Sequence, residues 1–348
     1  MEIRPRLDPE HRAVLADWLA LRGDPRGELL SLELALERAA LDPGLDPAPL
    51  QGRLDVLRAD LEPRWEAELA ATLELSRAQL HAFMPGRWYA GLLLELALCP
   101  AAELARGEVP AVLFEWILAS DAAVALEVID AGELPGQVVL EQLATGPVRS
   151  RIHRLVLGDH RQVVGELALL GGQLPALRAL EVRGPGIELM GFVHPQLEQL
   201  RLVCRGDWSG VLTTAGVQLP ALSRLELRFD QRHLDAYWGP PGQGPPPEAI
   251  AGLLDRDALP ALRTLSLSRL ICDAHLLDAL IAAPAFASLR CLALTDVGCL
   301  VNVFAELAQR AEALRHLERL ELTDSAGRHT WVSDELRQLL PNLFVRAG

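Results

Sequence analysis

The chain has 348 residues, half of them apolar, so it is longer than one ordinary domain of roughly 100 to 200 residues and can bury a large core. Its formal net charge of −14 and its pI near 5.1 argue against a protein that coats nucleic-acid phosphates. All 33 basic residues are arginine. This excludes the usual forms of P-loop phosphate binding, Schiff-base formation and the kinase ATP-site ion pair, since these use a lysine ammonium group.

The cysteines and the first residues of the chain indicate a cellular compartment. Five cysteines without C-x-x-C spacing indicate neither a disulfide framework nor a zinc ribbon, and they are typical of buried thiols in a reducing compartment. The first residues lack the apolar stretch of a signal peptide, and no apolar run approaches the roughly 20 residues that a membrane-spanning helix needs. We therefore expect a cytoplasmic protein that does not bind a membrane.

Residues 8–38 predict two helices around a tight turn. Asp8 followed by Pro9 is typical of a helix start, Gly23 of a helix end, and Asp24-Pro25 of a second start. The phrase ADWLALRGDPRGELLSLE resembles the short repeat-companion domain that precedes repeat arrays in some bacterial proteins. Its matching residues are Ala16, Asp17, Trp18, Leu19, Gly23, Asp24, Pro25, Arg26, Gly27 and Glu28. The resemblance implies association with repeats rather than an activity, and we expect the segment to cover the open end of a repeat array.

The next residues extend this helical region and then change pattern. A third helix is predicted over 50–73, after the linker 41–49, so residues 1–82 should form a helical N-terminal cap. Residues 83–150 contain two strand-like stretches, 88–98 and 123–132, with a helix at 111–120 between them. These stretches predict two weaker repeats ahead of the clear ones.

From residue 151 onward the chain repeats one pattern of apolar residues. The template L-x-x-L-x-L, with Leu, Ile or Val at its apolar positions, occurs seven times. The triplets are Ile152/Leu155/Leu157, Leu177/Leu180/Val182, Leu197/Leu200/Leu202, Leu222/Leu225/Leu227, Leu262/Leu265/Leu267, Leu289/Leu292/Leu294 and Leu317/Leu320/Leu322. The phrase LPNL at 340–343 reads as a final half-copy. Because alternate residues of a strand face opposite sides, each triplet predicts one strand that buries its leucines while neighbouring strands pair in parallel.

The spacing of the triplets is nearly regular. Intervals between first leucines run 25, 20, 25, 40, 27, 28 and 26 residues, against a usual repeat of about 20 to 29. The 40-residue step contains DAYWGPPGQGPPPE at 235–248, which predicts a Pro-rich inserted loop rather than a lost repeat. Stretches at 163–173, 273–283 and 301–314 predict helices between the strands. Such a stack should bend with its strands on the concave side.

The pattern resembles the leucine-rich-repeat family over at least residues 151–345. The resemblance implies an α/β solenoid, a horseshoe or arc over residues 83–348, with its N-terminal end capped by helices. One position departs from the family: the asparagine or cysteine three residues after the last leucine is replaced in every copy, for example by Pro185 and Arg205. An asparagine ladder cannot form, so the turns after the strands need other hydrogen-bond partners.

The third, fifth and seventh positions of the template point away from the core, onto the concave face. In the early and middle copies they include a basic island with two acids: Arg154, Glu181, Arg183, Arg201, Arg224, Glu226 and Arg228. Either these charges pair across strands and only solubilise the sheet, or they receive an acidic segment of a partner. Tyr237 and Trp238 on the inserted loop are further candidate contacts, since aromatics are enriched in interface hot spots, although Trp238 can equally pack on the flank of the repeats.

The leading hypothesis is a non-catalytic interaction or scaffold protein that binds a protein partner on the concave face. The sequence has no H-E-x-x-H, G-x-S-x-G, dinucleotide-binding or EF-hand motif, and we expect no catalytic residue, metal or cofactor. An alternative is an enzyme with a carboxylate site in the N-terminal 150 residues around Asp17, Asp24 and Glu28, although helix capping and ion pairing explain these residues as well. Nucleic-acid binding through the arginines is a third hypothesis, disfavoured by the overall acidity.

Overall fold

The computed structural model describes residues 9–42, 44–72, 78, 87–89, 92–98, 114–115, 117–119, 121–132, 134–158, 163–205, 209–213, 215–230, 247–254, 257–270, 273–295, 303–324 and 334–347. The chain forms two compact units, residues 1–126 and 127–348. Asp8 and the expected domain boundary at 82–83 lie outside the described residues.

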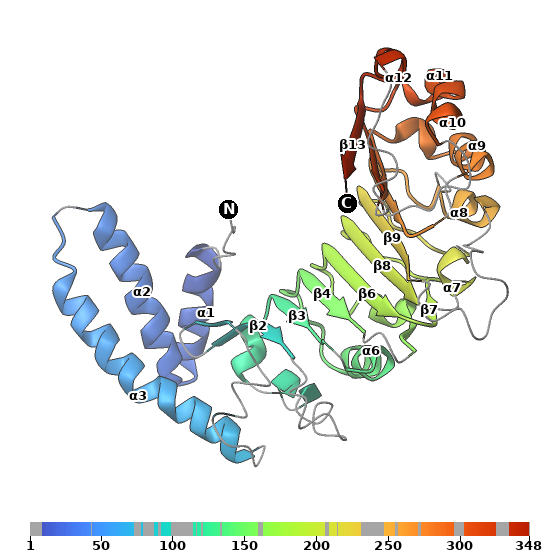
Figure 1. The fold of residues 1–348 in the computed structure, drawn as a ribbon. Coiled ribbons are helices and arrows are strands. Elements are labelled where there is room, and N and C mark those ends of the chain that lie inside the picture. The colour runs from blue at the N-terminus through green and yellow to red at the C-terminus, as the bar shows by residue number, and fades with distance from the viewer. Residues whose placement is uncertain are drawn as a thin grey trace. The chain divides into compact units, whose positions relative to one another are not determined.

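The first unit begins with helices α1 (Pro9–Leu21), α2 (Pro25–Leu41) and α3 (Ala48–Thr72), drawn in blue in Figure 1. The predicted turn between α1 and α2 is confirmed. Gly23 has a φ of 70°, a conformation that glycine adopts without strain, and the Asp24 side chain accepts a hydrogen bond from the backbone N–H of Arg26 at the start of α2. The three helices share one apolar core, which includes Leu19, Leu30 and Leu57.

The strands of the first unit differ from the prediction of one strand over 88–98. Strand β1 (Arg87–Tyr89) pairs antiparallel with β2 (Leu92–Ala97), so the chain reverses within that stretch. The intervening sequence is Ala90-Gly91, and glycine is favoured in two-residue hairpin connections. Within the predicted stretch 123–132, residues up to Ala125 belong to the 3₁₀ helix η1 (Asp121–Ala125), and only β3 (Val128–Asp130) is a strand.

In the second unit the described residues form one large parallel sheet, in the order β3, β4, β6, β8, β9, β10, β11, β12, β13, and a separate two-stranded sheet. The strands after β3 are β4 (Arg154–Leu157), β6 (Ala179–Gly184), β8 (Gln199–Arg205), β9 (Arg224–Asp230), β10 (Thr264–Ser268), β11 (Cys291–Thr295), β12 (Arg319–Asp324) and β13 (Leu343–Ala347). Each of the seven sequence triplets thus supplies one strand, as predicted, and the unit has the mixed α/β composition expected.

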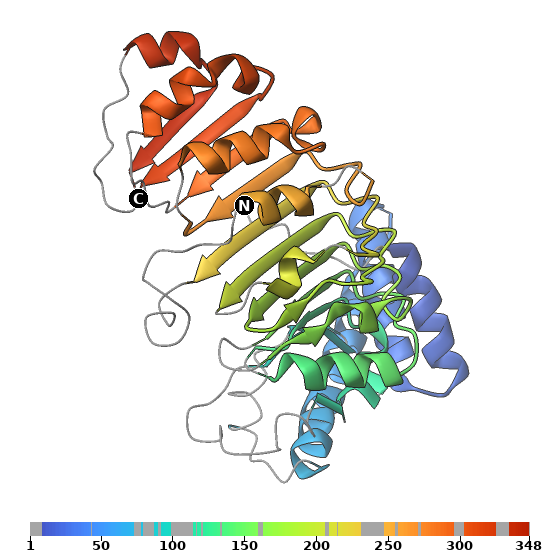
Figure 2. The same cartoon turned by 90° about the vertical axis from the view of Figure 1, so that its right-hand side faces the viewer.

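Helices lie on one face of this sheet, as Figure 2 shows for the second unit. They are α6 (Gly136–Thr145), η2 (Leu167–Leu170), α7 (Ser209–Leu212), α8 (Pro247–Leu253), α9 (Ala274–Ala282), η4 (Phe286–Ser288), α10 (Val303–Gln309), α11 (Ala311–Leu314) and α12 (Asp334–Leu339). The predicted helices at 273–283 and 301–314 are confirmed by α9 and by α10 with α11. In the part of the chain that the structure describes, no helix is long and apolar enough to cross a membrane.

The recurring leucines form two columns across the sheet. The middle residues of the triplets pair in one register, namely Leu155, Leu180, Leu200, Leu225, Leu265, Leu292 and Leu320. The last residues pair in the same way, namely Leu157, Val182, Leu202, Leu227, Leu267, Leu294 and Leu322. All of them are at most 2% exposed. Burying one such side chain stabilises the fold by about 1.5–3 kcal/mol, so the two columns hold every strand in phase with its neighbours.

The 40-residue interval does not interrupt the columns. Strands β9 and β10 pair directly, with Leu225 opposite Leu265. This is the arrangement expected when a loop is inserted between two repeats and no strand is lost. Residues 235–246 of the predicted loop lie outside the described residues, and Pro247 already belongs to α8.

Two details of the repeat prediction are wrong. Residues 163–173 were expected to form a helix, yet the backbone N–H groups of Val164 and Gly165 bond to Pro185 and Gly186 of the next repeat, and β5 (Gly165–Glu166) pairs with β7 (Ile187–Glu188). Only η2 is helical there. The phrase LPNL is also a full copy displaced by three residues, because Leu343 pairs with Leu320 and Val345 with Leu322.

Side chains from successive repeats bond the carbonyl groups that precede the strands. The His194 Nε2 atom lies 2.9 Å from the Leu174 oxygen, Ser288 Oγ donates to Leu262 over 3.3 Å, and Asn342 Nδ2 donates to Leu317 over 2.7 Å. After the strands, backbone N–H groups bond across repeats, for example Arg269 to the Thr295 oxygen at 3.1 Å. These backbone groups therefore find partners without an asparagine ladder.

Helix packing in the first unit gives a test with a matched control. A Cβ at Gly27 would lie 2.6 Å from the Ala20 nitrogen and 2.7 Å from the Ala16 oxygen, both backbone atoms of α1, whereas a Cβ at Gly52 of α3 meets nothing within 4 Å. We expect Gly27→Ala to lower the free energy of unfolding by about 1–3 kcal/mol, because α2 must move away from α1. Gly52→Ala should raise it by up to about 1 kcal/mol through helix propensity. Urea unfolding followed by circular dichroism measures both, and equal effects would contradict this packing.

The two described cysteines of the second unit should differ in reactivity. Cys204 is buried at the end of β8, and this burial raises the pKa of its thiol to about 12, so almost no thiolate forms at neutral pH. Cys291 on β11 is partly exposed. We expect iodoacetamide to label Cys291 in the folded protein and to label Cys204 only after denaturation. Peptide mass mapping reads both sites, and rapid native labelling of Cys204 would show that it is not buried.

Candidate binding face of the parallel sheet

The sheet of the second unit has a face without helices in its described part, as Figure 1 shows, and we call it the open face. Alternate burial along the strands shows which residues it carries: in β6 and β11 every second residue is partly exposed, and these are the third, fifth and seventh positions of the template. The open face therefore consists of Arg154, Val156, Ala179, Glu181, Arg183, Gln199, Arg201, Val203, Arg224, Glu226, Arg228, Thr264, Ser266, Ser268, Cys291, Ala293, Thr295, Arg319, Glu321, Thr323 and Phe344.

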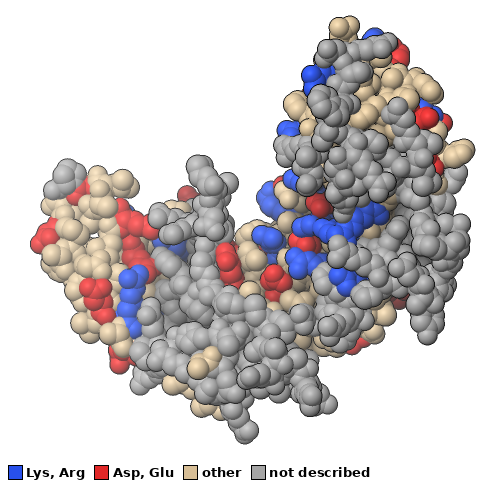
Figure 3. Space-filling model, in the orientation of Figure 1, with Lys and Arg blue, Asp and Glu red and all other residues tan. Residues whose placement is uncertain are grey.

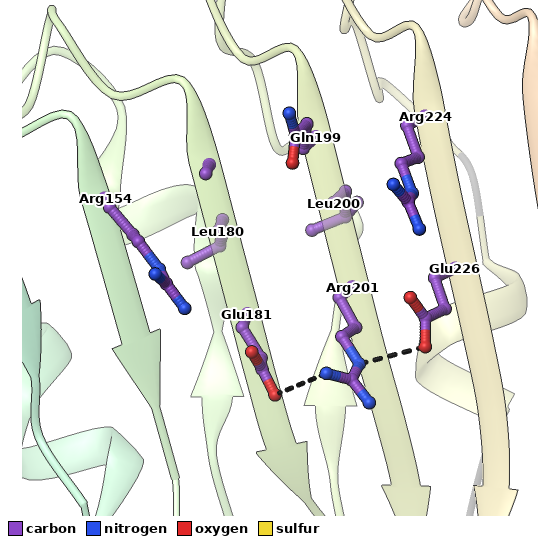
Figure 4. A pocket seen from close by; sticks show the side chains of 9 residues that line it. Arg154, Leu180, Glu181, Gln199, Leu200, Arg201, Arg224 and Glu226 are labelled. Atoms are coloured by element: carbon purple, nitrogen blue, oxygen red, sulfur yellow. Dashed lines mark ion pairs between the residues drawn. The ribbon is translucent and has the colours of Figure 1, made fainter. Parts of the chain in front are cut away.

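An arginine between two glutamates lies at the centre of the charged part. Parallel register places Glu181, Arg201 and Glu226 side by side on β6, β8 and β9. Arg201 reaches Glu181 with Nη1 at 3.4 Å and Glu226 with Nε at 3.0 Å, as the dashed lines in Figure 4 show. Arg183 adds a second cation to Glu181, with Nε donating to Oε1 over 2.7 Å. The cross-strand pairing that the sequence left open is therefore present for Arg183 and Arg201.

Three arginines of the same region have no such partner. Among the described residues no carboxylate oxygen forms an ion pair with Arg154, Arg224 or Arg228. Arg154 and Arg224 are exposed, and Arg228 is partly exposed. Their positive charges are available to a ligand, in contrast to that of Arg201.

A hollow of about 330 Å³ opens on this part of the face. Its lining comes from Arg154, Ala179, Leu180, Glu181, Gln199, Leu200, Arg201, Arg224 and Glu226. In Figure 4, Arg154 and Arg224 lie on opposite sides of it; the Arg154 side chain leans toward β6, and the Arg224 side chain runs along β9 toward Glu226. The hollow is thus bordered by two unpaired cations.

The charge of this region is opposite to that of the whole chain. On β4, β6, β8 and β9 the open-face positions hold five arginines and two glutamates, whereas the whole chain carries a net charge of −14. Figure 3 shows the arginines gathered over the middle of the sheet with acidic atoms among them. A local excess of positive charge of this kind attracts anionic groups.

Two valines predicted to point outward do not contribute accessible surface. Val156 is 2% exposed and Val203 is 6% exposed. Val156 lies in register between Asp130 and Glu181, and Val203 lies between Arg183 and Arg228. Both valines are shorter than these charged register partners.

The open face changes character beyond β9. Strands β10 and β11 present small uncharged side chains, including a hydroxyl pair in which Ser268 Oγ lies 2.6 Å from Thr295 Oγ1. Charge returns on β12, where Arg319 pairs with Glu321 and places its guanidinium carbon 5.1 Å from the centre of the Phe344 ring on β13. The sequence reasoning missed Phe344, which is 47% exposed, because it took LPNL for a half-copy. Reading Leu340, Leu343 and Val345 as a triplet would have found it.

The other sequence candidates lie elsewhere. Tyr237 and Trp238 are outside the described residues. In the first unit, Asp17 is exposed on α1, Glu28 pairs with Arg53 of α3 at 2.9 Å, and Asp24 caps α2. Burial alone would raise the pKa of Asp24, but its hydrogen bonds and ion pair with Arg26 outweigh burial and hold that pKa below its ordinary value. Glu28 and Asp24 thus pair with different arginines. Within the described ranges, no three His, Cys, Asp or Glu side chains gather as a metal site requires.

Comparisons with known proteins bear on the fold only. No protein-family model matches the chain, and no curated protein does. A solved structure with a similar fold is a Bacteroides fragilis protein determined by the Northeast Structural Genomics Consortium, with a TM-score of 0.51, 17% sequence identity and coverage of 73% of this chain and 73% of that one. At such low identity the similarity shows a shared mixed α/β architecture and carries no information on function.

Proposed function

We propose that the chain is a leucine-rich-repeat solenoid that works without catalysis, by binding a protein partner on its open face. The observation that carries the proposal is the hollow flanked by Arg154 and Arg224, two arginines that have no carboxylate partner among the described residues. Unpaired guanidinium groups with planar sets of donors suit the carboxylates of a protein surface.

The repeat interpretation is supported by the register of the leucine columns. Each triplet contributes its last two apolar residues to one strand, and neighbouring strands are parallel. The inserted segment leaves the leucine columns continuous, because Leu225 pairs with Leu265. In repeat proteins such a stack presents an extended surface on which side chains from many repeats act together. We therefore propose that the open face is the binding surface and that the second unit acts as its rigid support.

A protein partner fits the charges better than a nucleic acid does. The positive region is confined to a few strands, and Glu181 and Glu226 lie within it. A phosphate backbone carries one charge about every 3.4 Å per strand, so it would meet both glutamates as well as the acidic remainder of the chain. Protein segments can place carboxylates only where the unpaired arginines lie, and charge steers their approach.

This proposal predicts loss of partner binding when the unpaired arginines are reversed in charge. In Arg154→Glu/Arg224→Glu/Arg228→Glu, no described ion pair within the face is broken, so the fold should persist while the face becomes acidic. Proteins captured from the source cell by the wild-type chain should be reduced at least about tenfold with this variant, since hydrogen bonds to charged groups contribute about 1.5 kcal/mol or more each. Quantitative mass spectrometry of the captured proteins is the measurement.

The matched control is Arg38→Glu/Arg53→Glu/Arg315→Glu, which makes the same change in net charge at exposed positions on α2, on α3 and in the turn after α11. It should capture the same proteins as the wild type. Equal capture by the open-face variant and the wild type would eliminate the open face as the binding surface, and circular dichroism would establish that both variants are folded.

A further inference from the structure

We infer that the hollow binds an extended acidic peptide segment that crosses the strands, with two carboxylate side chains four residues apart, one bound by Arg154 and the other by Arg224. This inference rests on the proposed function and specifies the chemistry of the partner. It follows from the register of four neighbouring strands and from two arginines on them that have no carboxylate partner among the described residues.

The spacing follows from the register of the sheet. Arg154 on β4, Ala179 on β6, Gln199 on β8 and Arg224 on β9 are consecutive Cα partners, so three strand-to-strand steps separate the two arginines. With about 4.8 Å per step, the two Cα atoms are about 14 Å apart. An extended peptide advances about 3.2–3.4 Å per residue, so about four residues cover this distance. Side chains i and i+4 of an extended segment also point to the same side, which lets both carboxylates face the sheet.

The floor between the two arginines accommodates the intervening residues. Ala179 and Gln199 carry no charge, and the Gln199 side chain is exposed, so its amide is available to a peptide backbone group. Leu180 and Leu200 also line the hollow. A peptide with small neutral residues between its two acids would fit here without leaving a buried charge unpaired.

The neighbouring row restricts where acids can lie. Glu181 and Glu226 hold Arg201 between them, and their side chains are 12% and 22% exposed. A third carboxylate placed at Arg201 would meet two like charges at close range, which is unfavourable. The ion-paired row therefore keeps a ligand's acids at Arg154 and Arg224, and it disfavours an unbroken polyanion.

The test uses synthetic peptides and the full chain. Fluorescein-labelled peptides of Gly, Ser and Ala carry two glutamates, either four residues apart or three residues apart, with the same composition otherwise. In fluorescence anisotropy at low ionic strength, the i,i+4 peptide should bind about tenfold more tightly than the i,i+3 peptide, since only the former can reach both arginines. Binding should weaken in 1 M salt, where the Debye length falls to about 3 Å.

Variants locate the site and check it in two directions. Arg154→Gln and Arg224→Gln should each weaken the i,i+4 peptide about tenfold and remove the preference for that spacing, whereas Arg315→Gln on the helical side should change nothing. Glu181→Gln removes the acid that occupies Arg183 and Arg201. It should strengthen binding of both peptides several-fold, a gain that loss of folding cannot produce.

Several results would overturn the inference. Equal affinity for the two peptides would contradict the four-residue spacing of the carboxylates. Unchanged binding in Arg154→Gln and Arg224→Gln would show that the hollow is not the binding site. Tighter binding of a single-stranded oligonucleotide, lost in the same variants, would replace the peptide with a nucleic acid. The wider proposal fails separately, by undiminished protein capture with the triple charge-reversal variant, so the two failures are distinguishable.

Discussion

The structure of the second unit depends on the burial of two leucine columns in a single register. Each strand can satisfy its backbone in more than one alignment, but a shift by one residue would turn its leucines outward and its charged residues into the core. The cost of such a shift is several buried side chains of about 1.5–3 kcal/mol each. The buried leucines must therefore lie in one row, namely Leu155, Leu180, Leu200 and Leu225. The residue before each leucine then lies in a row as well, namely Arg154, Ala179, Gln199 and Arg224. The geometry of the candidate site is thus a consequence of core packing.

Parallel register also decides which charges remain available. Side chains at equivalent template positions become neighbours, so Glu181 and Glu226 each lie next to Arg201, and Arg183 also reaches Glu181. Arg201 lies within ion-pair distance of both acids, with Nε 3.0 Å from Glu226 and Nη1 3.4 Å from Glu181. A lysine ammonium group is a compact point charge without the guanidinium fork. On the open-face positions of β4 to β9, Arg183 and Arg201 are paired with glutamates, and Arg154, Arg224 and Arg228 have no carboxylate partner among the described residues.

The sequence predicted the parts of the fold that follow from local periodicity and failed where contacts between distant residues decide. Seven triplets sufficed for seven strands and for the outward position of Arg154, Arg201 and Arg224. Residues 163–173 have the apolar content of a helix, but the backbone of Val164 and Gly165 finds partners in the next repeat, a contact that no window of sequence contains. The depth of Val156 and Val203 likewise depends on side chains of neighbouring strands. Which charges of the site pair could not be predicted from local sequence, since Glu181 pairs with Arg201 twenty residues away.

The open face is asymmetric, and this bears on how any ligand can lie on it. Charged side chains occupy β4 to β9, while β10 and β11 present Thr264, Ser266 and Ala293 among other small residues, with Ser268 and Thr295 bonded to each other. A segment that continues past Arg224 in the direction of β10 would leave the unpaired cations and meet hydroxyl groups and short apolar side chains. Carboxylates there would lose hydration without gaining a cation, which costs free energy. In the proposed binding mode, acidic side chains of a ligand are therefore favoured over β4 to β9 and disfavoured over β10 and β11.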